Sequence, residues 1–465
     1  MTQRLSWVDA AFLELETEAA PTHVGELALF DLPPGFEGSF HDAFRRWFAA
    51  RAHLAPLFGA VLEPPAFPLD APRWAEAAAV DLDWHIRALR LPAPGGRAEL
   101  EAAVAALHAG RLDRSRPLWR FTVIEGLEGG QAALYAKIHH ASIDGAAGVI
   151  LARRLYDEAP EPRRVPPPPA QPAPRPLTLQ ERALRDFQEF GADLLRGQLR
   201  MMEAAPRAAM RAMEMVGPAL RGELSPPTGF APRTPFNRAI GPRRAYAARS
   251  LPLAEVRAVA HATGTTLNDV VLALAAGALR AWLGRRNALP AAPLVAFVPV
   301  SLRAAGDVAL DNQISGMASA LATDCADPVE RLRRIGRASR AAGRAARAFT
   351  PGRLPAFGAS LLGLMRQAGL ARIADFAPVA ANLVVANNAG PQAPLYCAGA
   401  RVAALHPVTF PMHGVGLGIA VLSYAGALDF GLVADADLIP DIDRLADDLV
   451  DAHRALRAAL GDPSD

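Results

Sequence analysis

The alternation of apolar and polar residues predicts a chain that mixes strands and helices throughout its length. The segment HVGELALFDL at 23–32 alternates like a half-buried strand, whereas SFHDAFRRWFAARA at 39–52 starts with a capping serine and repeats its apolar residues at helical spacing. Farther along, the segment at 265–286 predicts a helix, and the segments at 294–302 and 382–388 predict strands. The sequence therefore predicts an α/β fold with mixed sheets.

A proline-rich segment divides the chain into two parts. In APEPRRVPPPPAQPAPRP, closely spaced prolines exclude a helix and deny a sheet its hydrogen-bond donors. We expect an extended, semi-rigid crossover there. We assign residues 1–158 to an N-terminal half, 159–177 to the crossover linker and 178–465 to a C-terminal half. Two such halves place a cleft between them, which is the usual position of a binding site.

Composition and charge narrow the class of function. The chain has 465 residues, of which 51% are hydrophobic, so it is long enough for a large core, and its formal net charge of +2 is too small for a dedicated nucleic-acid binder. Cys325 and Cys397 are too few for a disulfide framework or a four-thiolate zinc site. The first residues lack the order of a secretory signal, and prolines and glycines break the uncharged run at 402–428 into strand-sized pieces. We therefore expect a cytoplasmic protein that binds no nucleic acid.

The candidate chemistry lies in YAKIHHASIDGAAG, at 135–148, where two adjacent histidines end a predicted strand. Residues 118–125 and 131–140 flank a glycine turn and are predicted to pair as a hairpin. Since strand side chains alternate between two faces, His140 is expected on the face of Ile138, and His139 on the opposite face. Two histidines that point apart cannot easily hold one metal ion, so we expect no metal site.

The residues after the histidines suggest why one of them is held rigidly. Asp144 and Gly145 stand at the predicted start of the helix GAAGVILARRLY, where an aspartate can fix a tight turn between strand and helix. The residues by themselves leave two interpretations open, a pair of structural histidines and a proton-transfer device. The hairpin also places three residues beside the histidines in a structural role, namely Pro117, Leu118 and Trp119.

The motif HHxxxDG, which His139, His140, Asp144 and Gly145 form here, resembles that of the coenzyme-A-dependent acyltransferase superfamily. This superfamily includes chloramphenicol acetyltransferase and the condensation domains of peptide synthetases. Five further segments, in chain order, resemble the bacterial wax ester synthase/diacylglycerol acyltransferase family: SWVDAAFLELE, RPLWR, TLNDVVLA, PVSLR and NLVVANNAGPQAPLY. The resemblance implies two chloramphenicol-acetyltransferase-like halves around a central cleft or tunnel, joined by the long crossover.

The resemblance also implies a reaction. A fatty acyl group passes from acyl-CoA to a long-chain alcohol or to diacylglycerol, by direct attack in a ternary complex, with no metal and no permanently bound cofactor. An alcohol is a poor nucleophile unless its proton is removed as the new bond forms, and by matching position His140 is the base. Two alternatives are a related acyltransferase that acts on a soluble small-molecule or polyketide alcohol, and a non-catalytic lipid-binding protein.

Several further residues are given supporting roles. We expect Asp144 to fix the turn that presents His140, instead of orienting the imidazole as in a Ser-His-Asp triad, and the resemblance implies that its partner is Arg303, through a bidentate contact. Asn268 is a candidate oxyanion donor, but with Asp269 at the start of a helix it suits a capping role equally well. The residues assigned to substrate binding are Asn312, Asn387, Gly390 and Pro391. Before Gly390, the residues Ala386–Ala389 depart from the Ser-Asn-Val run that is usual in the family.

Two amphipathic segments are candidates for contact with phosphates or lipid. One is LRDFQEFGADLLRGQLRMM, at 184–202, whose apolar residues share one side of a predicted helix that docks on the protein or on a membrane. The other is ERLRRIGRASRAAGRAARAF, at 330–349, whose arginines recur on one face of a predicted helix. They either contact coenzyme A phosphates or anionic lipid, or are only solvated. A peripheral position on the inner membrane or on lipid inclusions is therefore an alternative. The arginines of that face are Arg333, Arg337, Arg340, Arg344 and Arg347.

Overall fold

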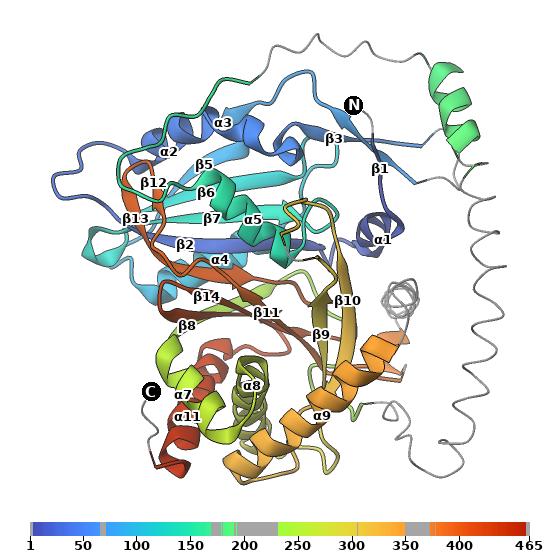
Figure 1. Ribbon diagram of the computed structural model, residues 1–465, viewed down its shortest axis with the longest axis vertical. Coiled ribbons are helices and arrows are strands. Elements are labelled where there is room, and N and C mark those ends of the chain that lie inside the picture. The colour runs from blue at the N-terminus through green and yellow to red at the C-terminus, as the bar shows by residue number, and fades with distance from the viewer. Residues whose placement is uncertain are drawn as a thin grey trace.

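Two six-stranded sheets, one beyond the other along the long axis, form the frame of the molecule (Figure 1). The computed structural model describes residues 3–65, 71–168, 178, 180–189, 192, 231–304, 306–348, 373–376 and 378–461. The first sheet has the order β12 (Tyr396–Cys397), β13 (Ala400–Val408), β2 (His23–Asp31), β7 (Ala132–His139), β6 (Trp119–Glu125), β5 (Ile86–Arg90). The second has the order β10 (Ile314–Ala320), β9 (Val295–Ser301), β11 (Leu383–Ala389), β14 (Leu417–Tyr424), β15 (Ala427–Asp435), β8 (Arg244–Pro252). A small sheet joins β1 (Gln3–Arg4), β4 (Arg73–Glu76) and β3 (Ala60–Glu63).

Helices cover both sheets. On the first sheet, α2 (Phe40–Ala49) and α5 (Gly145–Leu155) pack on one face and α4 (Arg97–Ala109) packs on the other. A group of four helices covers the second sheet (Figure 1). These four are α7 (Leu253–Thr263), α8 (Leu267–Gly284), α9 (Pro328–Ala348) and α11 (Ile442–Ala459). Further helices among the described residues are α1 (Trp7–Leu15), the short α3 (Leu82–His85) and a helix at 180–189.

The elements predicted from the alternation of polar and apolar residues are confirmed. The segment at 23–32 forms β2 and the segment at 39–52 forms α2, whose cap is Ser39 accepting a hydrogen bond from the Asp42 N–H at 3.4 Å. The other three predicted elements are α8, β9 and β11. Local periodicity was enough here because each segment has one face against a core.

The two apolar stretches long enough to cross a membrane belong to the core. The uncharged run at 402–428 supplies most of β13 and β14, as its prolines and glycines predicted. Helix α8 has the length and composition of a membrane span, but it contacts β11, α9 and α11, and most of its residues are buried.

The C-terminal part of the chain contributes two strands to the first sheet, which the division of the sequence into halves did not anticipate. Although β12 and β13 lie in the C-terminal part of the chain, they complete the first sheet, where β13 runs antiparallel to β2 with Val408 opposite Gly25. In Figure 1 these orange strands lie beside blue β2. The chain then returns to the second sheet through β14. The exchange brings the residues that follow β13 into the space between the sheets.

The crossover and the amphipathic segments are described only in part. Residues 161–168 form no helix or strand, as the prolines predicted, while 169–177 lie outside the described residues. Residues 180–189 form a helix, and the rest of the segment at 184–202 lies almost wholly outside the described residues. Charged side chains fix this short helix to the small sheet: Arg73 pairs with Asp186 at 2.9 Å and with Glu189 at 2.5 Å.

Candidate active site

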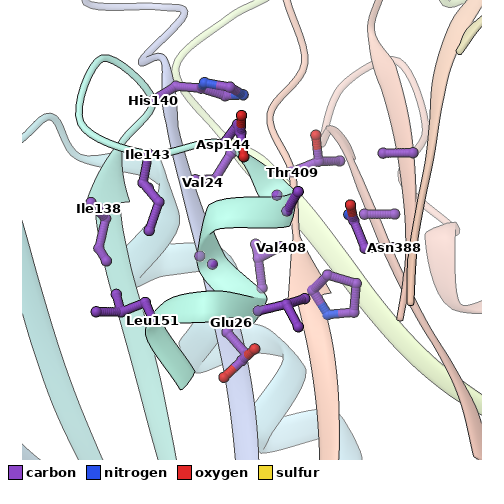
Figure 2. Close-up of a pocket in the computed structure, with 18 of the residues that line it drawn as sticks. Val24, Glu26, Ile138, His140, Ile143, Asp144, Leu151, Asn388, Val408 and Thr409 are labelled. Carbon is purple, nitrogen blue, oxygen red and sulfur yellow. The ribbon is translucent and has the colours of Figure 1, made fainter. Parts of the chain in front are cut away.

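A cavity of about 300 Å³ lies between the two six-stranded sheets. Strands β2 and β7 and helix α5 form one wall, and β9, β11 and the residues after β13 form the opposing wall. Figure 2 shows α5 running along the cavity, with His140 at one end and Glu26 at the other. Most lining side chains are apolar or aromatic, so the cavity suits an apolar ligand oriented by a few polar contacts. The polar lining residues are Glu26, His140, Asp144, Tyr156, Ser301, Ser315, Asn387, Asn388 and Thr409.

His140 reaches the cavity because of the register of the β6–β7 hairpin. Trp119 pairs with Ile138, and the His139 N–H donates to the Leu118 carbonyl at 2.9 Å. These contacts hold the end of β7 beside the start of β6. Ile138 and His140 line the cavity, whereas His139 does not. The predicted hairpin and the predicted separation of the two histidines are both confirmed.

The imidazole of His140 lies between two aromatic rings. It stacks on Phe12, with ring centroids 4.0 Å apart, and meets the edge of Phe410 at 5.7 Å. Burial lowers the pKa of His140 to about 4, although the charge of Asp144 opposes the shift. His140 is therefore neutral at neutral pH, with a nitrogen lone pair available to accept a proton.

His139, by contrast, is fully buried among hydrogen-bonding partners on the other face of β7. Its Nδ1 accepts from the Ala141 N–H at 3.0 Å, so Nδ1 is unprotonated and the ring proton is on Nε2. Nε2 lies 3.3 Å from the Thr22 hydroxyl and 3.5 Å from Glu16 Oε1. Glu16 is held in turn by Arg114 at 2.8 Å. This arrangement ties the strand end to the segment after α1 and leaves no ring nitrogen facing the cavity.

Asp144 fixes the turn between β7 and α5. One carboxylate oxygen accepts from the Ala147 N–H at 2.7 Å and so caps α5, while the other accepts from the Gln313 N–H at 2.9 Å and from Arg303 at 3.2 Å. Asp144 makes no hydrogen bond to His140 among the described residues. The predicted ion pair is confirmed, and its geometry is that of a positioning device.

The pair with Arg303 differs from the prediction in one respect. Only one guanidinium nitrogen reaches Asp144, because the arginine also donates to the carbonyls of Ala309 and Asp311, the former at 2.6 Å. The Arg303 side chain is almost fully buried, so one cation ties the β7–α5 turn to the loop between β9 and β10. The contact is therefore not bidentate, and the two halves are linked through a shared arginine.

Gly145 allows the two walls of the cavity to approach each other. A Cβ at this position would lie 2.6 Å from the side-chain nitrogen of Asn388, so a larger residue would displace the Asn388 side chain. Asn387 and Asn388 both line the cavity, and Figure 2 shows Asn388 on the wall opposite Ile143. The motif glycine therefore acts by close packing.

Comparison with known proteins identifies the family. Residues 5–271 match the wax ester synthase/diacylglycerol acyltransferase catalytic domain, and residues 310–457 match the C-terminal domain of the same family. The chain belongs to this family. A Mycobacterium tuberculosis protein named provisionally as a diacylglycerol O-acyltransferase is 37% identical over 453 residues, which cover 95% of this chain and 88% of the relative. A second protein of that organism with the same provisional name is 36% identical over 460 residues, covering 98% of this chain and 100% of the relative.

Solved structures agree with this assignment. The wax ester synthase/diacylglycerol acyltransferase from Marinobacter aquaeolei VT8 is 30% identical, with a TM-score of 0.73, and the match covers 99% of this chain and 100% of that one. The first condensation domain of the calcium-dependent antibiotic synthetase is 16% identical, with a TM-score of 0.59 over 100% of this chain and 98% of that one, and it shares the fold. This protein is thus an acyltransferase of the wax ester synthase/diacylglycerol acyltransferase family, with the predicted two-half fold.

Asn312 supports His140 without lining the cavity. Its side-chain nitrogen donates to the His140 carbonyl at 2.7 Å and to Asp9 at 2.6 Å. It thus holds the backbone of the base to helix α1. Of the residues assigned to substrate binding, only Asn387 lines the cavity.

The assignment of Gly390 and Pro391 to substrate binding is not supported by their placement, since neither lines the cavity. The Gly390 N–H donates to the Ser423 carbonyl at 3.0 Å, and a Cβ on Gly390 would lie 2.5 Å from that oxygen. The glycine lets the end of β11 pack directly against β14, which is a structural reason for its position.

Asn268 does not line the cavity either, so its placement does not support an oxyanion role. The start of α8 packs against α9, where a Cβ on Gly336 would lie 3.6 Å from Asp269 Oδ2. Asp269 and Thr266 form a reciprocal capping box, with hydrogen bonds of 3.0 and 3.2 Å. The capping alternative is therefore the one that the structure contains.

The residues before β6 are structural, as expected. Leu118 and Trp119 are each 1% exposed. The Trp119 indole donates to the Phe58 carbonyl at 3.0 Å and stacks on His85, with ring centroids 4.1 Å apart. Pro117 precedes the strand, and these residues support β6, against which β7 pairs.

Two other expectations concern ions. Among the described residues, no group of three or more histidine, cysteine or carboxylate side chains is arranged to hold a metal ion. Arg333, Arg337 and Arg340 are exposed on α9, and Arg337 pairs with Glu330 at 3.0 Å. The side chains of Arg344 and Arg347 lie outside the described residues.

Sequence reasoning missed several lining residues. Phe12 and Phe410 enclose His140 but lie far from it in the sequence. The lining residues Asn388 and Thr409 are also far from His140 in the sequence. In the sequence, Glu26 is only one polar position of the alternating strand at 23–32. Each lies in a segment whose element was predicted or whose motif was quoted, but no local spacing signals which of its residues face a cavity.

Proposed function

We propose that this protein transfers a long-chain fatty acyl group from acyl-CoA to a fatty alcohol or to diacylglycerol, with His140 as the general base. The observation that carries the proposal is the position of a neutral, rigidly presented imidazole on the wall of a largely apolar cavity between the sheets. Family membership supports the same reaction. Acyl-CoA is a substrate here, and the reaction needs no permanently bound cofactor.

The proposed chemistry uses one proton-transfer group twice. The acceptor hydroxyl oxygen attacks the thioester carbonyl carbon as His140 removes its proton, giving a tetrahedral oxyanion. Collapse of this intermediate breaks the carbon–sulfur bond, and the coenzyme A sulfur leaves with the proton from His140. The carboxylate of Asp144 stabilises the transient imidazolium, and such a base contributes about 10²–10⁴-fold to the rate.

The oxyanion requires hydrogen-bond donors. The Asn388 amide and the Thr409 hydroxyl line the cavity, and Figure 2 shows both on the side of the cavity away from Ile138 and Ile143. We assign this role to Asn388 in place of Asn268, because the side-chain amide of Asn388 has no hydrogen-bond partner among the described residues and Asn388 lines the cavity.

A coenzyme A release assay tests the proposed function. Purified protein is given a long-chain acyl-CoA with hexadecanol, diacylglycerol or a short soluble alcohol, with the His140→Ala variant as control. Release with a long-chain acceptor that the variant lacks supports the proposal. Release only with soluble alcohols supports the small-molecule acyltransferase, and binding of lipid without release supports the non-catalytic alternative.

A peripheral position on a lipid surface is a second, separate proposal. On the helix at 180–189, Leu184 and Phe187 are 60% and 66% exposed, while charged residues of the same helix fix it to the small sheet. Large apolar side chains held in solvent by a fixed helix are a feature of surfaces that insert shallowly into lipid. We expect Leu184→Ser/Phe187→Ser to reduce co-sedimentation with anionic phospholipid vesicles several-fold without altering the melting temperature. Equal sedimentation of both proteins contradicts the proposal.

A further inference from the structure

Glu26 is an ionisable residue at the end of the cavity that lies away from His140 (Figure 2). In the sheet, Glu26 pairs with Ala136 on β7, and His140 follows Ala136 by four residues on the same face. At about 3.3 Å per strand residue, Glu26 therefore lies ~13 Å along the wall from the base. A chain that places its reacting group at His140 passes Glu26.

The surroundings of Glu26 do not provide it with a partner. Its carboxylate makes no hydrogen bond and no ion pair among the described residues, and the side chain is partly exposed on the cavity wall. Its cavity neighbours at this end include Trp47 and Leu155, which are apolar or aromatic. The nearby carboxylate of Asp429 is already occupied by the Ser250 hydroxyl at 2.6 Å and the Leu405 N–H at 3.0 Å. A buried polar group normally finds a partner, so this one calls for an explanation.

Burial, together with the charge of Asp429, raises the pKa of Glu26 to about 7. Near neutral pH a large share of the molecules therefore holds a neutral carboxylic acid, which both donates and accepts a hydrogen bond.

Tyr156 adds a second polar group to the same end of the cavity. It follows the last turn of α5 and lines the cavity, and its hydroxyl has no hydrogen-bond partner among the described residues. Burial raises its pKa well above the ordinary value, and the charge of Glu26 adds to the shift. The hydroxyl remains protonated and is a donor. Two unpartnered polar groups at one end of an apolar cavity form a built subsite.

We propose that Glu26, with Tyr156, is a specificity-determining site that hydrogen-bonds a hydroxyl carried within the chain of a substrate, about 13 Å from the reacting group. The inference rests on the proposed acyl transfer and adds a preference to it. An all-hydrocarbon chain leaves the carboxyl group unpaired, whereas a hydroxyl at the matching position satisfies it. A site that hydrogen-bonds a substrate group disfavours the analogue that lacks the group.

The hydroxyl can belong to either substrate, and the experiment separates the two sources. One arm varies the acyl donor, comparing an unsubstituted acyl-CoA with hydroxyacyl-CoAs of equal length in which the hydroxyl moves along the chain. The other arm varies the acceptor, comparing hexadecanol with diols of equal length. The quantity measured is the ratio of kcat/KM for the hydroxylated and the plain substrate.

We expect the wild-type ratio to peak at one hydroxyl position, in one arm, and Glu26→Leu to lower that peak by at least about tenfold. Glu26→Gln, which keeps a donor and an acceptor, retains most of the peak. The matched control is Glu158→Leu, at an exposed glutamate outside the cavity, and it leaves the ratio unchanged. A flat wild-type ratio in both arms, or a peak that survives in Glu26→Leu, overturns the proposal.

A binding measurement separates this inference from the proposed reaction. Calorimetric titration of the hydroxylated and plain members of each arm, acyl donors and acceptors separately, gives Kd values without turnover, and the preference is expected in the same arm with the same dependence on Glu26. Absence of coenzyme A release with a retained binding preference contradicts the acyl transfer alone. Turnover of plain substrates with equal binding of hydroxylated and plain compounds in both arms contradicts the Glu26 site alone. Melting temperatures of all variants confirm that each protein is folded.

Discussion

The two faces of β7 show how the same residue type serves structure on one side and chemistry on the other. On the face of His139, polar side chains make hydrogen bonds inside the protein: Lys137 donates to the Leu107 carbonyl at 2.6 Å, and His108 Nδ1 lies 2.6 Å from the Tyr135 hydroxyl. On the face of His140, the imidazole meets aromatic rings and a cavity.

The contrast teaches which buried polar groups have a structural role. Burial disfavours charge on both faces, and it lowers the pKa of Lys137 to about 7. The face of His139 compensates with hydrogen bonds inside the protein. On the cavity face, the Glu26 carboxylate and the Asn388 side-chain amide have no hydrogen-bond partner among the described residues, which makes them available to a ligand.

The largest expected effect comes from exchanging the two histidines in turn for alanine. His140→Ala is expected to lower kcat by about 10²–10⁴-fold with an unchanged melting temperature, because it removes only the base. His139→Ala is expected to lower stability by about 1–3 kcal/mol and to retain partial activity, because it removes the acceptor of the Ala141 N–H and the contacts to Thr22 and Glu16. Initial rates and thermal melts of both variants check this. Equal, complete loss of activity at both positions contradicts the division between the faces.

The next effect concerns the turn that joins the two faces. Asp144→Ala and Arg303→Ala are each expected to lower the free energy of unfolding by about 3–5 kcal/mol, because each leaves a buried charge without its partner. Soluble yield and activity fall together. Denaturant titration of both variants measures the loss. An Asp144→Ala protein that is fully stable but inactive supports instead a triad in which Asp144 orients His140.

A smaller effect tests whether ionisation of Glu26 on the cavity face lowers the free energy of unfolding. The pKa of Glu26 is raised from 4.5 in the unfolded chain to about 7 in the folded protein, so stability is full below pH 4.5 and falls as the pH rises through 7. Glu26→Gln removes this dependence and is expected to stabilise the protein at pH 8 by up to about 3 kcal/mol, with little change at pH 4.5. Chemical denaturation at both pH values checks the difference. A stabilisation independent of pH contradicts the raised pKa.

The smallest expected effect is a kcat/KM that hardly depends on pH in a range where an ordinary catalytic histidine would become protonated. With its pKa lowered to about 4, His140 stays unprotonated down to about pH 5, so its protonation does not reduce kcat/KM between pH 5 and 7. An unburied histidine with a pKa of about 6.5 loses about tenfold by pH 5.5. Rates across this range, with circular dichroism to confirm folding, decide between the two. An acid limb near pH 6.5 contradicts the buried, neutral base.

Part of the site was predictable because it is local. The hairpin, the capping role of Asp144 and the opposite orientation of His139 and His140 depend on residues within a few positions of each other. The Asp144–Arg303 pair was also predicted, from the resemblance to the superfamily. The sequence could not decide between an oxyanion role and a capping role for Asn268, because a polar residue at a helix start has the same local pattern whether it caps the helix or faces a cavity.

The sequence by itself determined the strand and helix periods, the end of β7 and the turn after it, since these follow from backbone geometry and near neighbours. Only the tertiary structure decided which side chains enclose His140, because Phe12 and Phe410 meet it from segments far from it in the chain. It also decided that β13 joins the first sheet, and that Glu26 faces a cavity without a partner among the described residues. Alternation in a strand fixes which residues share a face, but what lies against that face depends on the packing of the whole chain.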